Sequence, residues 1–195
     1  MPIEDQLQWR TEWEAWRTWR ARVEAIGVLV FQFAKVGLAE VRGISLLHAP
    51  LPVVGINRKE IPEGKSFTLL HEVVHLMLAA GEEEKPALLE KRSGAEWQQV
   101  ERFAAIAASY APNPGQTRKA AIGGRRDEFA TPPEEAINRN GRPFVQLVLE
   151  ALDANRITSV DAGRHLDLKF EHFGKLRGML SQRPIVGSLG SRHAA

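Results

Sequence analysis

The sequence predicts an α+β fold that is mainly helical, with a small three-stranded sheet packed on one helix. Three short β-rich segments follow one another between residues 28 and 57, at a spacing typical of neighbouring strands. Apolar residues recur at helical spacing in much of the remaining chain. The 195 residues, 44% hydrophobic and 26% charged, suit one domain, alone or with a small appendage.

The composition limits the chemistry that the chain can carry. Cysteine is absent, which excludes disulfides, thiolate zinc sites and a cysteine nucleophile. A metal ion would therefore need histidine or carboxylate ligands. The apolar runs reach about ten residues, too few to span a bilayer, and the opening MPIEDQLQWR does not resemble a secretory signal. We therefore expect a cytoplasmic protein that makes no membrane contact.

The charge pattern gives little reason to expect nucleic-acid binding. The net charge is +2, and basic and acidic residues are interspersed along most of the chain. DNA-binding domains usually concentrate basic residues on one face. The segment 115–128, GQTRKAAIGGRRDE, is locally basic. We interpret it as a solvated loop, with a nucleic-acid patch as the alternative.

The chain opens with a Trp-rich helix that we assign to residues 1–25, with a clear amphipathic pattern from residue 4. Four tryptophans recur near helical spacing, with arginines between them: Trp9, Trp13, Trp16 and Trp19. We interpret this stripe as facing the core, with a dimer or partner surface as the alternative. Gly27 then ends the pattern.

Residues 26–110 form the predicted core of the domain, made of a sheet and two helices. The β-rich segments cover residues 28–33, 41–49 and 52–57. After a polar loop, Ser66 has the character of a helix N-cap, which predicts a helix over about 67–80 ended by Gly81. The sequence SGAE at 93–96 has the form of a capping box and predicts a second helix to about residue 109.

The C-terminal part divides into three predicted segments. Residues 111–142 are rich in Pro, Gly, Arg and Asn and predict a long irregular connection. Residues 143–180 predict a helical segment, with helices over 143–154, 156–168 and 169–180 and with Thr158 as an N-cap. Residues 181–195 predict a disordered tail.

The predicted helix over 67–80 carries an unusual polar group. His71, Glu72 and His75 form the pattern His-Glu-x-x-His. Residues four apart on a helix project from the same face, so the two imidazoles can bind one Zn²⁺. Glu72 adjoins the first ligand, where it can act as general base on a water molecule held by the metal.

The alternative is a core helix with tolerated polar residues. The neighbours of this trio are almost all apolar, so we expect the helix to be buried nearly all round. Without a metal ion, the two histidines and the glutamate would need other hydrogen-bond partners in the core. A metal site is therefore the less costly explanation.

A catalytic zinc site needs a third protein ligand and leaves one position open. LMLAAGEEEK follows the motif directly and supplies no third histidine. Glu101 is the best candidate, because its helical neighbours Ala104, Ala105 and Ala108 are small and suit close packing against another helix. The alternative for Glu101 is a surface carboxylate paired with Arg102 or Lys91.

The motif block resembles that of the ImmA/IrrE family of metallopeptidases. That family combines a short strand ending in Asn with a loop and Phe-Thr-Leu-x-His-Glu-x-x-His. The stretches PVVGIN and SFTLLHEVVH match it at Asn57, Phe67, Thr68, Leu69, His71, Glu72 and His75. A later family segment, Glu-x-Phe-Cys-Asn-x-x-Ala-Ala, is similar to ERFAAIAAS at Glu101, Phe103, Ala107 and Ala108. With the C-terminal stretch, the resemblance covers roughly residues 20–110 and 140–178.

The resemblance implies a zincin-like domain that acts as a zinc-dependent endopeptidase. His71, His75 and Glu101 would be the metal ligands and Glu72 the general base. Family members often cleave a helix-turn-helix transcriptional repressor during stress responses or mobile-element induction. The implied partner is therefore a repressor protein, and direct nucleic-acid binding is not expected.

The sequence departs from the family in three places. Ala104-Ala105 replaces a Cys-Asn pair, the segment after residue 109 replaces a longer helical part, and no N-terminal helix-turn-helix domain is visible. We therefore expect a shortened member. Tyr110, His165 and His172 are candidates for the donor that stabilises the oxyanion, with surface or packing roles as the alternative.

Two further function classes remain open from the sequence. TSVDAGRHLDLKFEHFGKL has the pattern of a helix-turn-helix, which would suit a regulatory module that binds DNA or protein. Helices packed against the peptidase core are the simpler interpretation, because acidic residues are interspersed. A catalytically impaired zinc-binding protein that acts as a sensor is the third class. The oligomeric state is not predicted.

Overall fold

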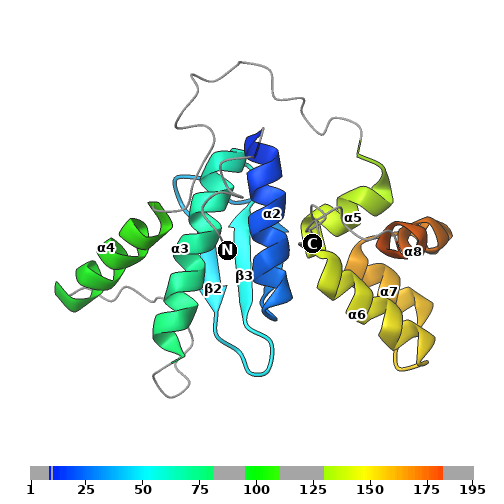
Figure 1. Ribbon diagram of the computed structural model, residues 1–195. Helices are drawn as coiled ribbons and strands as arrows, with labels where there is room; N and C mark the ends of the chain where they lie inside the picture. Colours follow the sequence, from blue (N-terminus) through cyan, green and yellow to red (C-terminus); the bar gives the residue numbers. More distant parts are fainter. Residues whose placement is uncertain (1–8, 10, 81–94, 110–129, 182–195) are drawn as a thin grey trace, which may run out of the picture.

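The computed structural model describes residues 9, 11–80, 95–109 and 130–181. Three strands form a mixed sheet in the order β1-β3-β2, with β1 parallel and β2 antiparallel to β3: Leu29–Phe33 (β1), Gly43–Leu46 (β2) and Val53–Asn57 (β3). Two helices, α2 (Glu12–Ala25) and α3 (Pro62–Ala79), lie side by side over one face of this sheet (Figure 1). The predicted mainly helical α+β fold with a three-stranded sheet is therefore confirmed.

The core of this first part lies between the sheet and the two helices. Every second residue of β1 and β3 points to this face, since side chains alternate along a strand. Val54, Ile56 and Leu69 are fully buried there. The buried cluster consists of Trp16, Val23, Val28, Val30, Val54, Ile56, Leu69 and Leu76.

Three of the four tryptophans of the predicted stripe face the core, and Trp9 instead meets Trp19 edge to face. Trp16 is 3% exposed, and Trp13 and Trp19 pack against the same cluster. The helix is shorter than the expected 4–25, because Thr11 has extended backbone angles and caps the helix that starts at Glu12. The rest of the predicted N-terminal helix, residues 1–8 and 10, lies outside the described residues.

The prediction for the start of the metal-motif helix was wrong. Helix α3 begins at Pro62 rather than at residue 67, and its N-cap is Ile61, with no side-chain cap. Proline suits the first helical position, where its missing N–H costs nothing. Ser66 lies inside the helix, and its hydroxyl donates to the carbonyl of Pro62 at 3.1 Å. The predicted caps Gly81 and Ser93 lie outside the described residues.

The expectation that α3 is buried nearly all round was also wrong. Leu69 and Leu76 are buried, but Phe67 is 40%, Leu78 43% and Met77 71% exposed. Helices α2 and α4 (Ala95–Ser109) and strands β2 and β3 pack against α3 but cover only part of its circumference. Among the described residues, no helix combines the length and apolar character needed to cross a membrane.

The C-terminal helices form a second cluster on the side of α2 away from α3 and α4 (Figure 1), and the first of these helices contacts β1. They are α5 (Pro132–Asn140), α6 (Arg142–Asp153), α7 (Ser159–Leu166), the short 3₁₀ helix η2 (Phe170–His172) and α8 (Phe173–Ser181). Val145, Leu166 and Leu176 are fully buried in the core that these helices share. Thr158 is the N-cap of α7, as predicted, and forms a capping box with Asp161.

The structure corrects two boundaries in this region. The predicted irregular connection over 111–142 contains α5, because Thr131 and Glu134 form a capping box and Pro132 occupies the first turn. The single helix predicted over 169–180 is divided into η2 and α8. Most of the predicted tail over 181–195 lies outside the described residues, and Ser181 belongs to α8.

Arg20 joins the two parts of the molecule. Its side chain is buried, pairs with Glu24 at 2.9 Å, and donates to the carbonyls of Val30 in β1 and Asn138 in α5, both at 2.5 Å. Phe31 of β1 also meets Phe144 of α6 edge to face, with ring centroids 5.0 Å apart. The C-terminal helices are therefore anchored on the β1 side of the sheet, away from β2.

Candidate metal site

The three predicted ligands come together between α3 and α4, which pack against each other (Figure 1). His71 and His75 lie one turn apart on α3, with their Nε2 atoms 3.0 Å from each other. Glu101 of α4 places one carboxylate oxygen 3.2 Å from His71 Nε2 and the other 3.5 Å from His75 Nε2. The structure therefore supports the predicted role of Glu101 as the third member of the group.

These distances suit a single ion. Ligands in a tetrahedral site with metal bonds of about 2.0–2.1 Å lie about 3.3 Å from one another. One ligand atom from each of the three residues lies within 4.8 Å of the others. The set of two imidazoles and one carboxylate is also a known catalytic zinc set. The group could therefore hold a metal ion with a further position left for a substrate or water.

Small residues allow α4 to approach α3. Ala104 and Ala108, one and two turns after Glu101, are 0% and 3% exposed. A larger side chain at either position would move the two helices apart and draw the carboxylate away from the histidines. The predicted small-residue face of α4 is therefore confirmed as the packing face. Lys91, one predicted alternative partner of Glu101, lies outside the described residues.

The electrostatic surroundings keep His75 neutral. Burial lowers the pKa of His75 below its usual value of 6.5, the nearby His71 lowers it further, and Glu101 opposes both. A histidine must be unprotonated to bind a metal ion. At neutral pH the imidazole of His75 is therefore already in its binding form.

Glu72 lies beside the metal group but does not belong to it. It is 8% exposed and faces the sheet side of α3. Burial raises the pKa of its carboxyl to about 7, the Ser45 hydroxyl opposes the rise, and Glu101 adds to it. Ser45 Oγ is buried and makes no hydrogen bond of ordinary geometry within the described part of the chain. A carboxyl with this pKa can take up and release a proton near neutral pH.

Strand β2 approaches Glu72 very closely. A Cβ atom at Gly43 would overlap the methyl group of Thr68 and lie 2.9 Å from Glu72 Oε1. Gly43 therefore has a steric reason to be glycine, because its missing side chain leaves space for the carboxylate. Sequence reasoning missed both Gly43 and Ser45. Their spacing of two on one strand was the available signal that both face the same side of the sheet.

We expect Gly43→Ala to destabilise the protein by about 1–3 kcal/mol, because overpacking of a tight contact has this cost. The displaced Glu72 should also lower any activity that depends on its position. Chemical denaturation measures the first effect. Gly174→Ala is the matched control, since a Cβ there meets no atom within 4 Å and the exchange should be neutral or slightly stabilising. Equal stability of the two variants would contradict the expectation.

The three candidates for an oxyanion donor are not brought to the site. His165 lies on α7 and His172 on η2, at the end of the molecule opposite α4 (Figure 1). Tyr110 lies outside the described residues. The described residues therefore do not identify this donor.

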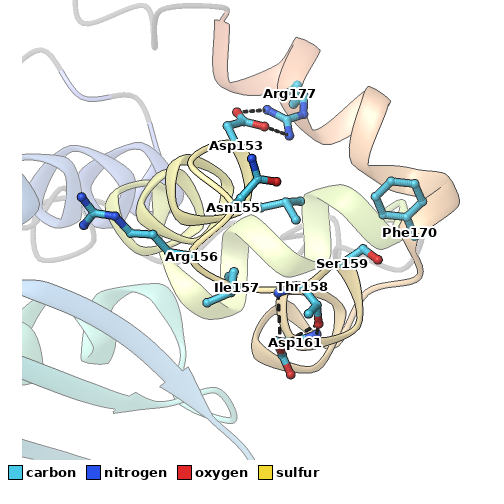
Figure 2. A pocket seen from close by; sticks show the side chains of 10 residues that line it. Asp153, Asn155, Arg156, Ile157, Thr158, Ser159, Asp161, Phe170 and Arg177 are labelled. Carbon is cyan, nitrogen blue, oxygen red and sulfur yellow. Dashed lines mark hydrogen bonds and ion pairs between the residues drawn. The ribbon is translucent and has the colours of Figure 1, made fainter.

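A separate pocket lies among the C-terminal helices (Figure 2). Its volume is about 560 Å³, and its walls include Ile157, Thr158 and Phe170. Asp153 and Arg177 face each other across two hydrogen bonds of 2.6 Å at its edge, and Thr158 pairs with Asp161 (Figure 2). These two pairs satisfy each other's polar groups, and the pocket shares no residue with the metal group.

No protein-family model matches the chain, and neither the search of curated proteins nor that of solved structures finds a significant match.

Proposed function

We propose that the chain is a zinc-dependent endopeptidase of the ImmA/IrrE type. The observation that carries this proposal is the convergence of His71, His75 and Glu101 on one point, with the Glu72 carboxyl close enough for the charge of Glu101 to raise its pKa. A general base next to a metal group is an arrangement that suits metal-assisted hydrolysis of a peptide bond. The motifs shared with that family support the same function.

Each residue has a distinct role in the proposed reaction. His71, His75 and Glu101 would hold a zinc ion, which supplies charge to polarise the scissile carbonyl and acidify a water molecule. Glu72 accepts a proton as the water oxygen bonds to the carbonyl carbon. Glu72 then donates the proton to the amide nitrogen as the carbon–nitrogen bond breaks. The raised pKa of Glu72 supports both transfers near neutral pH.

Strand β2 offers a way to align the substrate. It is an edge strand, and Arg42 O accepts a hydrogen bond from Asn57 N of β3. Hydrogen-bonded and non-bonded pairs alternate in an antiparallel ladder, so the backbone groups of Gly43 and Ser45 face the open edge. An extended peptide can add to such an edge as a further strand. Bound there, its backbone would run past Glu72 and the metal group.

The C-terminal helices give little support to the rival function of DNA binding. Residues 130–181 contain seven basic and seven acidic side chains. Two of the basic residues, Arg139 and Arg177, pair with Asp167 and Asp153. A DNA-binding surface needs an excess of basic groups on one face. We therefore propose that a repressor protein is the substrate and that these helices do not bind DNA themselves.

The test is a cleavage assay with zinc-loaded protein in the presence of helix-turn-helix repressors encoded by neighbouring genes. We expect one repressor to be cut at a single peptide bond, located by mass spectrometry. A chelator should stop the cleavage, and added zinc should restore it. Zinc-loaded protein that cuts none of these repressors would contradict the proposal and favour a zinc-binding sensor.

A further inference from the structure

Phe67 is an aromatic residue that the core does not explain. It lies on α3 one turn before His71 and is 40% exposed. Its ring stacks on the His71 imidazole, with centroids 6.0 Å apart and an angle of 26° between the planes. This separation is within the range of favourable offset stacking. The side chain thus covers a proposed metal ligand instead of joining the buried cluster.

The described residues do not give His71 the hydrogen bond to its second ring nitrogen that usually orients a metal-binding histidine. Such a histidine generally donates its second ring N–H to a carboxylate or carbonyl group, which fixes the orientation of the ring. The Nδ1 atom of His71 is buried and has no hydrogen-bond partner among the described residues. Rotation about the last side-chain torsion of histidine is broad and roughly two-fold. Rotation of the ring out of its present plane would carry Nε2 away from His75 and Glu101.

We propose that Phe67 is a positioning residue for His71. The flat face of its ring disfavours rotation of the imidazole out of the plane in which Nε2 meets His75 and Glu101. Stacking thereby restricts the ring in place of a hydrogen bond to Nδ1, for which the described residues supply no partner. The inference rests on the metal-binding part of the proposed function and does not depend on peptide hydrolysis.

The first experiment measures zinc affinity by competition with a chromophoric chelator. Phe67→Leu keeps an apolar side chain but removes the flat ring, and we expect zinc to bind about tenfold more weakly, as when an outer hydrogen bond is lost. Phe67→Tyr keeps the ring and should retain wild-type affinity. Phe103→Leu is the matched control, because it removes a 56% exposed ring two residues from Glu101.

The second experiment tests the stacking without a metal ion. Ring-current shifts of the His71 ring protons are measured by NMR in zinc-free protein. We expect Phe67→Leu to lose the shift and Phe67→Tyr to keep it, with the melting temperature unchanged in both variants. A lost ring-current shift with an unchanged melting temperature shows that the stacking on the His71 ring is lost while the protein remains folded.

The outcomes separate this inference from the proposed function. Wild-type zinc affinity in Phe67→Leu would overturn the proposed role of Phe67. Equal loss of zinc affinity in the Leu and Tyr variants would overturn it as well. A protein that binds zinc and cuts no repressor would refute the peptidase proposal and leave the role of Phe67 standing. A wild-type protein that takes up no zinc, and shows no ring-current shift, would overturn both.

Discussion

We expect Glu72→Gln to abolish the proposed peptide hydrolysis and to leave the zinc content unchanged. Glutamine has nearly the same size as glutamate, so the tight contact with Gly43 is preserved. It cannot accept a proton, and loss of a general base typically lowers the rate by about 10²–10⁴-fold. The measurement is the initial rate of repressor cleavage by wild-type and variant proteins at equal zinc content. A variant that retains the wild-type rate would exclude Glu72 as the base.

The same substitution should stabilise the zinc-free protein above neutral pH. The folded-state pKa of Glu72 is raised to about 7 from 4.5, so the folded protein holds this proton more firmly than the unfolded chain. The stability that depends on the proton is therefore present below pH 4.5 and is lost as the pH rises towards 7. The shift corresponds to about 3 kcal/mol.

Urea denaturation at several pH values tests this effect in zinc-free wild type and Glu72→Gln. We expect the free energy of unfolding of the wild type to fall between pH 5 and pH 8 and that of the variant to fall less. Loss of activity together with gain of stability would mark a residue kept for function. If the free energy of unfolding depends on pH in the same way in both proteins, burial does not raise the pKa of this carboxyl.

Removal of any one metal ligand is expected to abolish stable zinc binding. We expect elemental analysis to find one zinc ion per wild-type chain and none in His75→Ala. Loss of an outer partner already weakens metal binding by about 10–100-fold, so loss of a direct ligand should weaken it further. Glu101→Gln should have a similar effect, because it removes the charge that α4 brings to the two histidines.

His165→Ala is the control for these variants. His165 is an exposed histidine on α7, so its removal tests whether histidine loss alone changes zinc content. Equal zinc content in all variants and the control would contradict the site. Retention in Glu101→Gln alone would instead show that the two histidines suffice and that α4 supplies no ligand.

Local signals in the sequence predicted most of the elements and the metal group. The three β-rich segments contain the three strands of the structure. They were predictable because each is short, apolar and bounded by turn residues. Thr158 predicted its helix, since a capping box depends on residues three apart. The spacing of His71 and His75 fixed their shared face, and alanines around Glu101 indicated a helix close by.

Tertiary contacts explain what the sequence did not reveal. The apolar character of α3 suggested burial on all sides, yet Met77 is exposed because packing covers only part of the helix. Pro132 and Pro133 looked like breakers, although prolines at the start of a helix are favourable. The proximity of Gly43 to Glu72 depends on how β2 lies against α3, which no local pattern encodes.

The origin of the three ligands on two helices has a thermodynamic consequence. Among the described elements, α4 packs chiefly on α3, so a bound ion would tie α4 to the rest of the fold. Metal affinity and the docking of α4 are then linked quantities, and each strengthens the other by the same free energy. The C-terminal helices share no residue with the site, so zinc binding would not stabilise them directly. The zinc concentration would thus determine the fraction of molecules in which α4, which carries Glu101, is docked on α3.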